Sequence, residues 1–253
     1  MNGLSDQTAL LQMGITTTAA NWELDEKKPT GFCRVYYVKN RAVRYTDEYA
    51  DEFFEPETLY ILPTAVPYRA RLALKEPLHC TFWHLDLFPA QLTRLVRLPV
   101  ERDSALYFCL RAMEKLMEAA DREQLIPMLG IFPVLLSRTP WFDRPSPFMQ
   151  ELTKYITDHL NEDIQIETLS RITKYHPNYF ISLFKAESGF TPHRYILRLR
   201  MQKARRLLIT GRRVSEVALE VGYQDAASFT RAFKAVNGVT PQQYALGDAV
   251  ILR

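Results

Sequence analysis

The side chains with the clearest chemical potential lie on two short predicted helices near the end of the chain. Phe180 and Phe184 mark the inner face of the first helix, and Phe229 and Phe233 mark that of the second. The residues that this packing leaves facing outward, or at the helix start, are His176, Asn178, Tyr179, Ser182 and Lys185 on the first helix, and Ala226, Ala227, Thr230, Arg231 and Lys234 on the second.

These outward groups suit contacts with nucleic acid. The guanidinium of Arg231 can pair with guanine through two hydrogen bonds, and the amide of Asn178 can do the same with adenine. The Ser182, Thr230 and Lys185 side chains suit phosphate contacts, which fix the register of a protein on DNA without reading its sequence. Ala226 and Ala227 offer only apolar contact or close approach, so we expect the second helix to read few bases.

Several of these residues also have a purely structural explanation. A lysine on a helix is often only solvated, and for Lys185 and Lys234 this weighs equally with a phosphate contact. Asp225, which precedes the second helix, is more simply explained as a helix cap than as a DNA contact. Ile181 at the helix surface could touch a thymine methyl group.

A repeat explains how the two helices are held. Residues 184–195 and 233–244 share seven identical positions at one constant offset, including a glycine and a Thr-Pro pair. Gly189 and Gly238 suit left-handed helix ends, and a proline in the first turn begins the next helix without losing a needed donor. Two helices joined by a tight turn are therefore predicted twice, at about 166–187 and 214–236. This is the helix-turn-helix arrangement, whose second helix enters the major groove.

The earlier part of the chain has a different pattern. Short apolar runs at 35–38, 59–62 and 79–87, punctuated by prolines, predict a small antiparallel barrel or sandwich. Two apolar helices are predicted at about 104–117 and 125–136. Pro127 fits the first turn of the second helix, and Pro133 should kink or end it. These helices could cover the open face of the sheet or form a dimer interface.

Composition places the chain among globular proteins. The 253 residues are 47% hydrophobic, and a proline-rich stretch at 138–147 predicts a boundary between domains 1–140 and 146–253. Residues 148–253 carry 15 Lys and Arg against 10 Asp and Glu, whereas residues 1–147 carry 17 against 19. A basic C-terminal part suits an anionic polymer. Three scattered cysteines and no signal-like or membrane-spanning segment favour the cytoplasm.

The motifs of common enzymes are missing. The sequence has no Gly-rich phosphate loop, no GxSxG and no HExxH, so no catalytic residue and no cofactor is predicted. His79 and His84 would lie on opposite faces of a regular strand and would not bind one metal ion. A small-molecule site is still conceivable, because the β-rich part offers aromatic walls with polar tips in Tyr37, Tyr60, Tyr68, Arg69, Trp83 and His84. Ordinary core packing is the simpler explanation for any one of them.

The C-terminal motifs resemble the AraC/XylS family of bacterial transcription regulators over about residues 148–247. The resemblance is carried by an ordered set of residues: Phe184, Lys185, Gly189, Arg200, Ala204, Leu207, Leu208, Ala218, Gly222, Tyr223, Asp225, Phe229, Phe233, Lys234, Gly238, Val239, Thr240, Pro241 and Tyr244. The sequence departs from the family pattern at Ser170 and Lys174, where a small Ala and a turn Gly are usual, so we expect a strained or differently shaped first turn.

The resemblance implies an α+β multidomain protein. Its C-terminal part would be all-α, with two helix-turn-helix units joined by a long helix at about 192–209. Its N-terminal part would be a small cupin-like β-barrel with a helical hairpin, which senses an effector and dimerises. The implied partners are double-stranded promoter or operator DNA, a small-molecule effector, RNA polymerase and a second copy of the chain. The alternative is a cupin-like small-molecule-binding protein or enzyme with a helical partner-binding tail.

Overall fold

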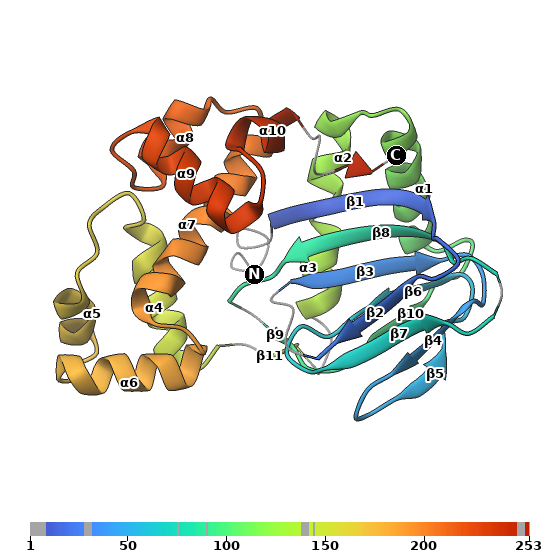
Figure 1. The fold of residues 1–253 in the computed structure, drawn as a ribbon, viewed down its shortest axis with the longest axis horizontal. Coiled ribbons are helices and arrows are strands. Elements are labelled where there is room, and N and C mark those ends of the chain that lie inside the picture. Colours follow the sequence, from blue (N-terminus) through green and yellow to red (C-terminus); the bar gives the residue numbers. More distant parts are fainter. Residues whose placement is uncertain are drawn as a thin grey trace. The chain divides into compact units, whose positions relative to one another are not determined.

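The computed structural model describes residues 9–27, 32–74, 76–89, 91–137, 142–143, 145–246 and 251–252. The chain divides into two compact units. The first unit comprises Met1–Leu87, Gln91–Asp143 and Ala249–Arg253, and the second comprises Phe88–Ala90 and Arg144–Asp248. Figure 1 shows that strands belong almost entirely to the first unit and that the second is helical.

The first unit contains two larger sheets and a two-stranded ribbon. The six-stranded sheet has the order β10-β6-β3-β8-β1-β12, with β10 (Val96–Pro99), β6 (Thr58–Ile61), β3 (Cys33–Val38), β8 (His79–Asp86), β1 (Ala9–Thr17) and β12 (Ile251–Leu252). The four-stranded sheet has the order β2-β7-β4-β5, with β2 (Glu23–Glu26), β7 (Tyr68–Leu72), β4 (Val43–Thr46) and β5 (Asp51–Phe53). The ribbon pairs β9 (Gln91–Leu92) with β11 (Phe142–Asp143). Neighbouring strands are antiparallel except β1 and β12.

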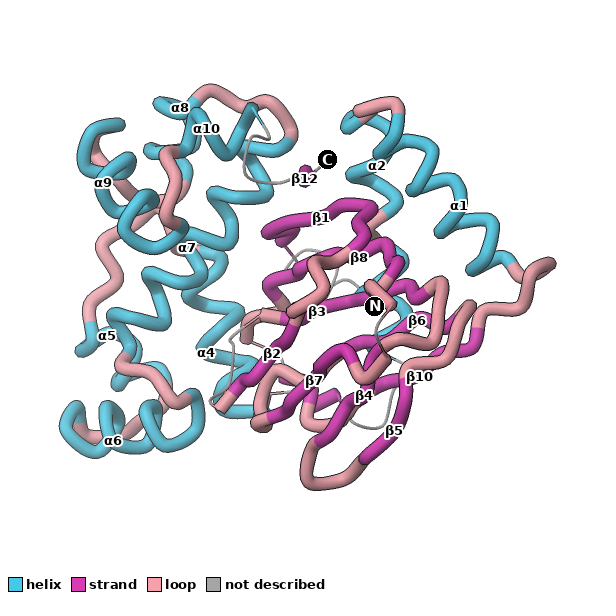
Figure 2. Tube along the Cα trace, turned by 45° about the vertical axis from the view of Figure 1, so that its right-hand side comes forward, coloured by secondary structure: helices cyan, strands magenta, loops and turns pink. Residues whose placement is uncertain are grey.

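Alternating side chains give the six-stranded sheet two apolar faces. One face, which includes Tyr36, Tyr60 and Phe82, shares a core with Tyr45 and Ala70 of the four-stranded sheet. The two sheets remain separate in their hydrogen bonding, and Figure 2 shows them as distinct layers. The predicted barrel is therefore wrong for the described strands, and the alternative prediction of a sandwich of antiparallel sheets is closer.

Helices cover the other face of the six-stranded sheet. Here α1 (Ala105–Glu118) sends Glu114 to accept a hydrogen bond from Thr81 Oγ1 at 2.5 Å, and α3 (Ile131–Ser137) packs Phe132 against Trp83 with ring centres 5.1 Å apart. Ser104 caps α1 by accepting from the amide of Tyr107. Of the two uses considered for these helices, covering the sheet is the one that the structure supports.

The second predicted hairpin helix is two helices, and the expected place of its prolines is wrong. The first, α2 (Arg122–Met128), begins three residues earlier than predicted because Asp121 caps it by accepting from the amide of Gln124. Pro127 therefore lies in the last turn of α2, and Pro133 lies in the first turn of α3, where its missing donor costs nothing. The break falls between the two prolines.

The second unit is built from seven helices within the described residues. They are α4 (Pro147–Asp158), α5 (Ile166–Ile172), α6 (Pro177–Ser188), α7 (Pro192–Ile209), α8 (Val214–Glu220), α9 (Ala226–Asn237) and α10 (Pro241–Leu246). The buried core of the first half joins Phe180 and Phe184 of α6 to Tyr195 of α7. Phe88 belongs to this core, with its ring centre 4.7 Å from that of Tyr195. Its carbonyl also accepts a hydrogen bond from the buried Gln202 at 2.8 Å.

Candidate nucleic-acid interface

Two helix pairs, α5–α6 and α8–α9, repeat the same local construction. The second helix of each pair ends at a glycine in the left-handed conformation, Gly189 with φ 74° and Gly238 with φ 76°. Prolines then open the following helices, α7 and α10. Both predictions about the repeat are confirmed in backbone geometry, although Thr191 makes no side-chain cap, whereas Thr240 Oγ1 accepts from the amide of Gln243.

The two turns differ in length. The start of α8 lies 48 residues after the start of α5, but α9 begins 49 residues after α6. The turn before α9 is therefore one residue longer. At matching places, Lys174 and Gly222 adopt left-handed backbone with φ 58° and 84°. The first turn differs from the second in length, as expected. Its backbone is alike at one point, because Lys174 adopts the left-handed conformation that Gly222 supplies in the second turn.

A long helix with a half-buried guanidinium holds the two pairs together. Arg200 on α7 donates from Nε to the carbonyl of Leu160 at 3.1 Å and from Nη2 to the carbonyl of Glu162 at 2.7 Å. Its guanidinium also lies 5.9 Å from the ring centre of Tyr223 in the second turn. Burial lowers the pKa of Arg200 from its usual value. Arg200 thus has a structural role, because it ties the loop after α4 to α7 and to the second turn.

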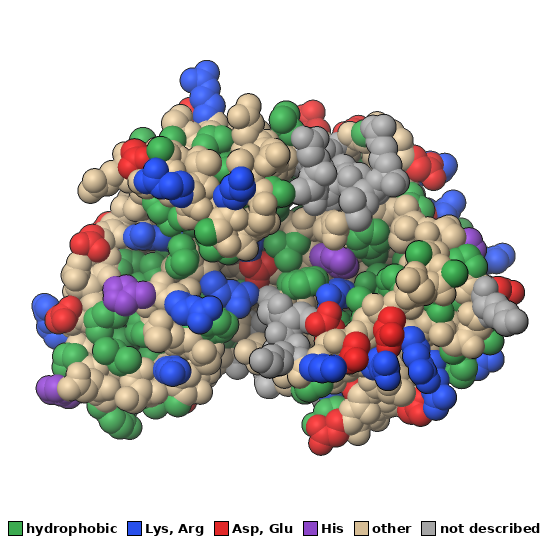
Figure 3. Space-filling view, viewed as in Figure 1, with side chains coloured by type: hydrophobic (Ala, Val, Ile, Leu, Met, Phe, Trp, Pro, Cys, Tyr) green, Lys and Arg blue, Asp and Glu red, His purple; other side chains and the backbone are tan. Residues whose placement is uncertain are grey.

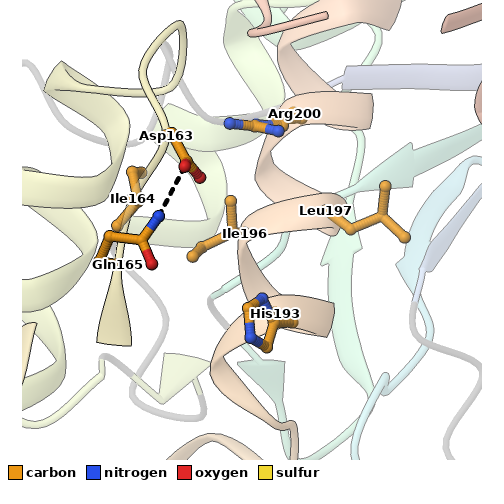
Figure 4. A pocket seen from close by; sticks show the side chains of 7 residues that line it. All are labelled: Asp163, Ile164, Gln165, His193, Ile196, Leu197 and Arg200. Carbon is orange, nitrogen blue, oxygen red and sulfur yellow. Dashed lines mark hydrogen bonds between the residues drawn. The ribbon is translucent and has the colours of Figure 1, made fainter. Parts of the chain in front are cut away.

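A shallow hollow of about 300 Å³ lies beside this arginine (Figure 4). Its lining comes from the loop before α5 and from α7: Asp163, Ile164, Gln165, His193, Ile196, Leu197 and Arg200. The Gln165 side chain donates to Asp163 at 2.6 Å across one wall. The cationic side of the hollow is the arginine already engaged with carbonyl oxygens, so the hollow is better explained as a seam between α4, α5 and α7 than as a binding site.

The predicted outward side chains of α6 are all at the surface. His176, Asn178, Tyr179, Ser182 and Lys185 are exposed, whereas Phe180 and Phe184 are fully buried. Ser182 Oγ donates to the backbone carbonyl of Asn178 within the helix, a bond that does not involve the Asn178 side chain. The first helix therefore presents an accessible polar and aromatic face.

The outward face of α9 is smaller and more basic. Ala227, Arg231 and Lys234 are exposed, and Ala226 and Thr230 are partly buried. Arg231 Nη2 donates to Ser228 Oγ at 3.0 Å, which holds the guanidinium along the helix surface. Asp225 accepts from the amide of Ser228 at 2.7 Å, and this bond lowers the pKa of its carboxyl group. The interpretation of Asp225 as a cap is confirmed.

The six residues predicted for a ligand do not converge in the first unit. Tyr37 and Trp83 lie on the sheet face that α1–α3 cover, and Tyr37 donates to Glu57. Tyr60 and His84 lie on the opposite face, and Tyr68 reaches the same core from the four-stranded sheet. Arg69 points outward and pairs with Glu23. Only Tyr68 and His84 come close to one polar cluster, described next.

That cluster contains a residue that sequence reasoning missed. Arg34 lies opposite His84 in the register of β3 and β8, donates to Tyr68 Oη at 2.6 Å and pairs with Glu26 at 2.6 Å. Burial, and then the charge of Arg34, lowers the pKa of His84 to about 4. His84 Nε2 is buried and has no hydrogen-bond partner among the described residues. Arg34 could have been noticed in the sequence, because it is a charged residue within the apolar strand that begins at Cys33.

Among the residues that the structure describes, no group of three His, Cys, Asp or Glu side chains could hold a metal ion. In the same part of the chain no helix has both the length and the apolar character needed to cross a membrane.

The geometry of the second unit, with two helix–turn–helix pairs on one connecting helix, defines a helix-turn-helix protein. Residues 169–246 match a family model described as a helix-turn-helix domain. The C-terminal region of this chain is therefore a helix-turn-helix domain, as the repeated helix pairs in its sequence predicted.

Relatives match over this region. The chain is 40% identical over 91 residues to the HTH-type transcriptional regulator YobQ of Bacillus subtilis, covering 36% of this chain and 38% of YobQ. It is 34% identical over 94 residues to the probable transcriptional regulator LumQ of Photobacterium leiognathi, covering 37% and 38%. It is 33% identical over 94 residues to the MmsAB operon regulatory protein of Pseudomonas aeruginosa, covering 37% and 31%. The matches thus span under two fifths of each relative.

One solved structure is similar over nearly the whole chain. ToxT from Vibrio cholerae, bound to (E)-4-(8-methylnaphthalen-1-yl)but-3-enoic acid, superposes with a TM-score of 0.54 at 9% identity and covers 94% of this chain and 98% of ToxT. This likeness concerns the fold: a sheet-rich N-terminal unit followed by a helical C-terminal unit.

Proposed function

We propose that this chain is a sequence-specific regulator of transcription whose second unit binds duplex DNA through α6 and α9. The observation that carries the proposal is the pair of equivalent helices, each following a tight turn and each presenting exposed side chains opposite two buried phenylalanines. An α-helix of this kind fits the major groove, and two helices held by one rigid helix would address successive segments of it.

The exposed groups divide into two roles. Arg231 reads a guanine through two hydrogen bonds, for which it must release Ser228, and Asn178 reads an adenine. Lys185, Lys234, Ser182 and Thr230 contact phosphates and fix the register. The name of each relative cited, as a transcriptional or operon regulator, supports this proposal over the catalytic alternative.

The test uses the full chain with genomic fragments across a salt series. Selected fragments should share a motif, and affinity should fall steeply as salt rises. Arg231→Ala should relax preference at one guanine at a cost of roughly 1–3 kcal/mol. Lys154→Ala on α4 is a matched control, because it removes one exposed cation of the same unit that pairs with Asp158 on its own helix. Uniform binding to all fragments, or equal losses in both variants, would count against the proposal.

We further propose that a small molecule with an anionic group binds in the first unit and controls DNA binding. The support is the Arg34–Tyr68–His84 cluster, where a buried cation and an unpaired imidazole nitrogen sit beside aromatic rings. ToxT, with the same overall fold, is described as bound to an unsaturated fatty acid. Homodimerisation and contact with RNA polymerase, which the family resemblance implies, complete this proposal.

A thermal-shift titration with oleate tests the effector site. We expect a saturable rise in melting temperature that Arg34→Met abolishes, since the methionine keeps the bulk and removes the charge. Arg69→Met is the control, because Arg69 is exposed and pairs with Glu23. The site is wrong if both variants respond as the unaltered chain does.

A further inference from the structure

The two recognition helices carry different chemistry at equivalent positions. The helices align residue for residue from their first turns, so that each α6 position has an α9 counterpart 49 residues later. Tyr179 and Ile181 of α6 correspond to Ser228 and Thr230 of α9. Conversely, Arg231 of α9 corresponds to Ser182 of α6. Hydroxyl side chains on α9 therefore stand where α6 has Tyr179 and Ile181, and a hydroxyl side chain on α6 stands where α9 has the guanidinium of Arg231.

The apolar side chains Tyr179 and Ile181 of α6 remain accessible and do not belong to the buried core of the unit. Tyr179 is 56% exposed and Ile181 is 37% exposed, whereas the inner face of the helix is formed by Phe180 and Phe184. Figure 3 shows hydrophobic side chains reaching the surface in the region of α6. Large apolar groups on the outer face of a recognition helix expose surface to water unless a ligand covers them.

An aromatic pair positions the start of this face. The ring of Tyr179 meets that of Tyr175, in the turn, edge to face at 5.1 Å. Tyr175 in turn contacts Phe148 of α4, with ring centres 6.2 Å apart. The pair therefore extends from the core side of the unit to the first turn of α6, which is the part of a recognition helix that contacts base edges. Aromatic side chains held in this way lose little conformational freedom on binding.

From these positions we infer that α6 reads thymine methyl groups through Tyr179 and Ile181, while α9 reads guanine through Arg231. The inference rests on the proposed DNA-binding function and adds to it the chemistry of each half-site. In the major groove, the C5-methyl of thymine is the apolar group that a base pair presents, and it is met by apolar side chains. The binding site is thus asymmetric, with a thymine-bearing segment under α6 and a guanine-bearing segment under α9.

Replacing thymine by deoxyuridine tests this directly, because it removes only the methyl group. A consensus duplex is first selected from random sequences with the full chain, and each thymine is then replaced in turn. We expect about fourfold weaker binding at one or more thymines in the segment that lacks the critical guanine, the effect of one buried methyl group. Replacing guanine by 7-deazaguanine should weaken binding in the other segment.

Variants assign the effect to residues. Tyr179→Ala and Ile181→Ala should bind the thymine duplex more weakly and distinguish thymine from deoxyuridine less, while keeping their sensitivity to 7-deazaguanine. Leu219→Ala is the matched control, because Leu219 is 61% exposed but lies on α8. Circular dichroism of each variant verifies folding.

The outcomes separate the two proposals. If the chain selects no DNA motif, the proposed function fails and this inference falls with it. If a motif is selected but deoxyuridine has no effect in either segment, or its effect persists in both α6 variants, the function stands and the thymine inference is overturned. In that case we would assign the exposed Tyr179 and Ile181 side chains to a protein partner instead of DNA.

Discussion

Replacing Gly222 by alanine should disrupt the second unit far more than the same change at Gly238. Both glycines have left-handed backbone, with φ 84° and 76°, so alanine costs about 1 kcal/mol at either position from conformation alone. At Gly238 an added Cβ meets nothing within 4 Å. At Gly222 it would overlap the Leu160 carbonyl and lie 2.8 Å from Nη2 of Arg200.

The extra cost at Gly222 follows from what must move. The carbonyl is backbone, and the guanidinium is fixed by two hydrogen bonds to carbonyl oxygens. Loss of one such bond to a charged group costs about 1.5–3 kcal/mol, so Gly222→Ala should destabilise by about 2.5–4 kcal/mol in total. The double variant Gly222→Ala/Arg200→Ala should be destabilised by less than the sum of the two single variants, because both single changes disrupt the same hydrogen bonds of Arg200.

Urea unfolding of the full chain, followed by circular dichroism at 222 nm, measures both variants. Hydrogen exchange of peptides covering residues 155–165 adds a local reading, because the loop that Arg200 holds should exchange faster in Gly222→Ala alone. Equal destabilisation by Gly222→Ala and Gly238→Ala would refute the reasoning, since it would show that the close approach to Leu160 and Arg200 has no energetic weight.

Three further predictions concern other local features. Lys174→Gly should raise the free energy of unfolding in urea by roughly 0.5–1 kcal/mol. Glycine relieves the left-handed strain at φ 58°, and this gain exceeds the greater conformational entropy that glycine gives the unfolded chain. Asp225→Ala should cost about 1 kcal/mol in the same assay and Asp225→Asn much less, since the amide still caps α9. The pKa of His84 is lowered from 6.5 to about 4, so folding favours the neutral imidazole. The free energy of unfolding is therefore unaffected by this group above pH 6.5 and falls by about 2 kcal/mol by pH 5, where the unfolded chain binds the proton. His84→Gln should flatten that part of the stability curve, and an unchanged slope would contradict the assigned burial.

The second unit could be predicted closely from sequence because its signals are local. Gly189 and Gly238 end helices, and Pro192 and Pro241 begin them, within a few residues of the positions that the repeat indicated. The outward positions of α6 and α9 followed from the burial of two phenylalanines in each. What was missed was long-range: the hydrogen bonds of Arg200 to a loop forty residues away could not be found from spacing.

The first unit was predicted less well because sheets depend on pairing between distant segments. The three predicted runs became β3, β6 and β8, but no strand was predicted over the residues of β1, which pairs with β8 along its whole length. The six candidate ligand residues were chosen by type, and strand alternation then placed Tyr37 and His84 on opposite faces. A one-residue change of register reverses a side chain, so residue type alone cannot locate a site on a sheet.

The place of Phe88 means that the boundary in sequence and the boundary in space do not coincide. A fragment that begins near residue 145 carries every helix of the second unit but lacks Phe88, whose ring packs against Phe190 and Tyr195 and whose carbonyl accepts a hydrogen bond from Gln202. Burial of one phenylalanine contributes about 1.5–3 kcal/mol, a large part of the stability of a small helical domain. Excision would therefore weaken the very domain it is meant to isolate. Loss of DNA binding by such a fragment would report on a missing piece of core rather than on the recognition helices.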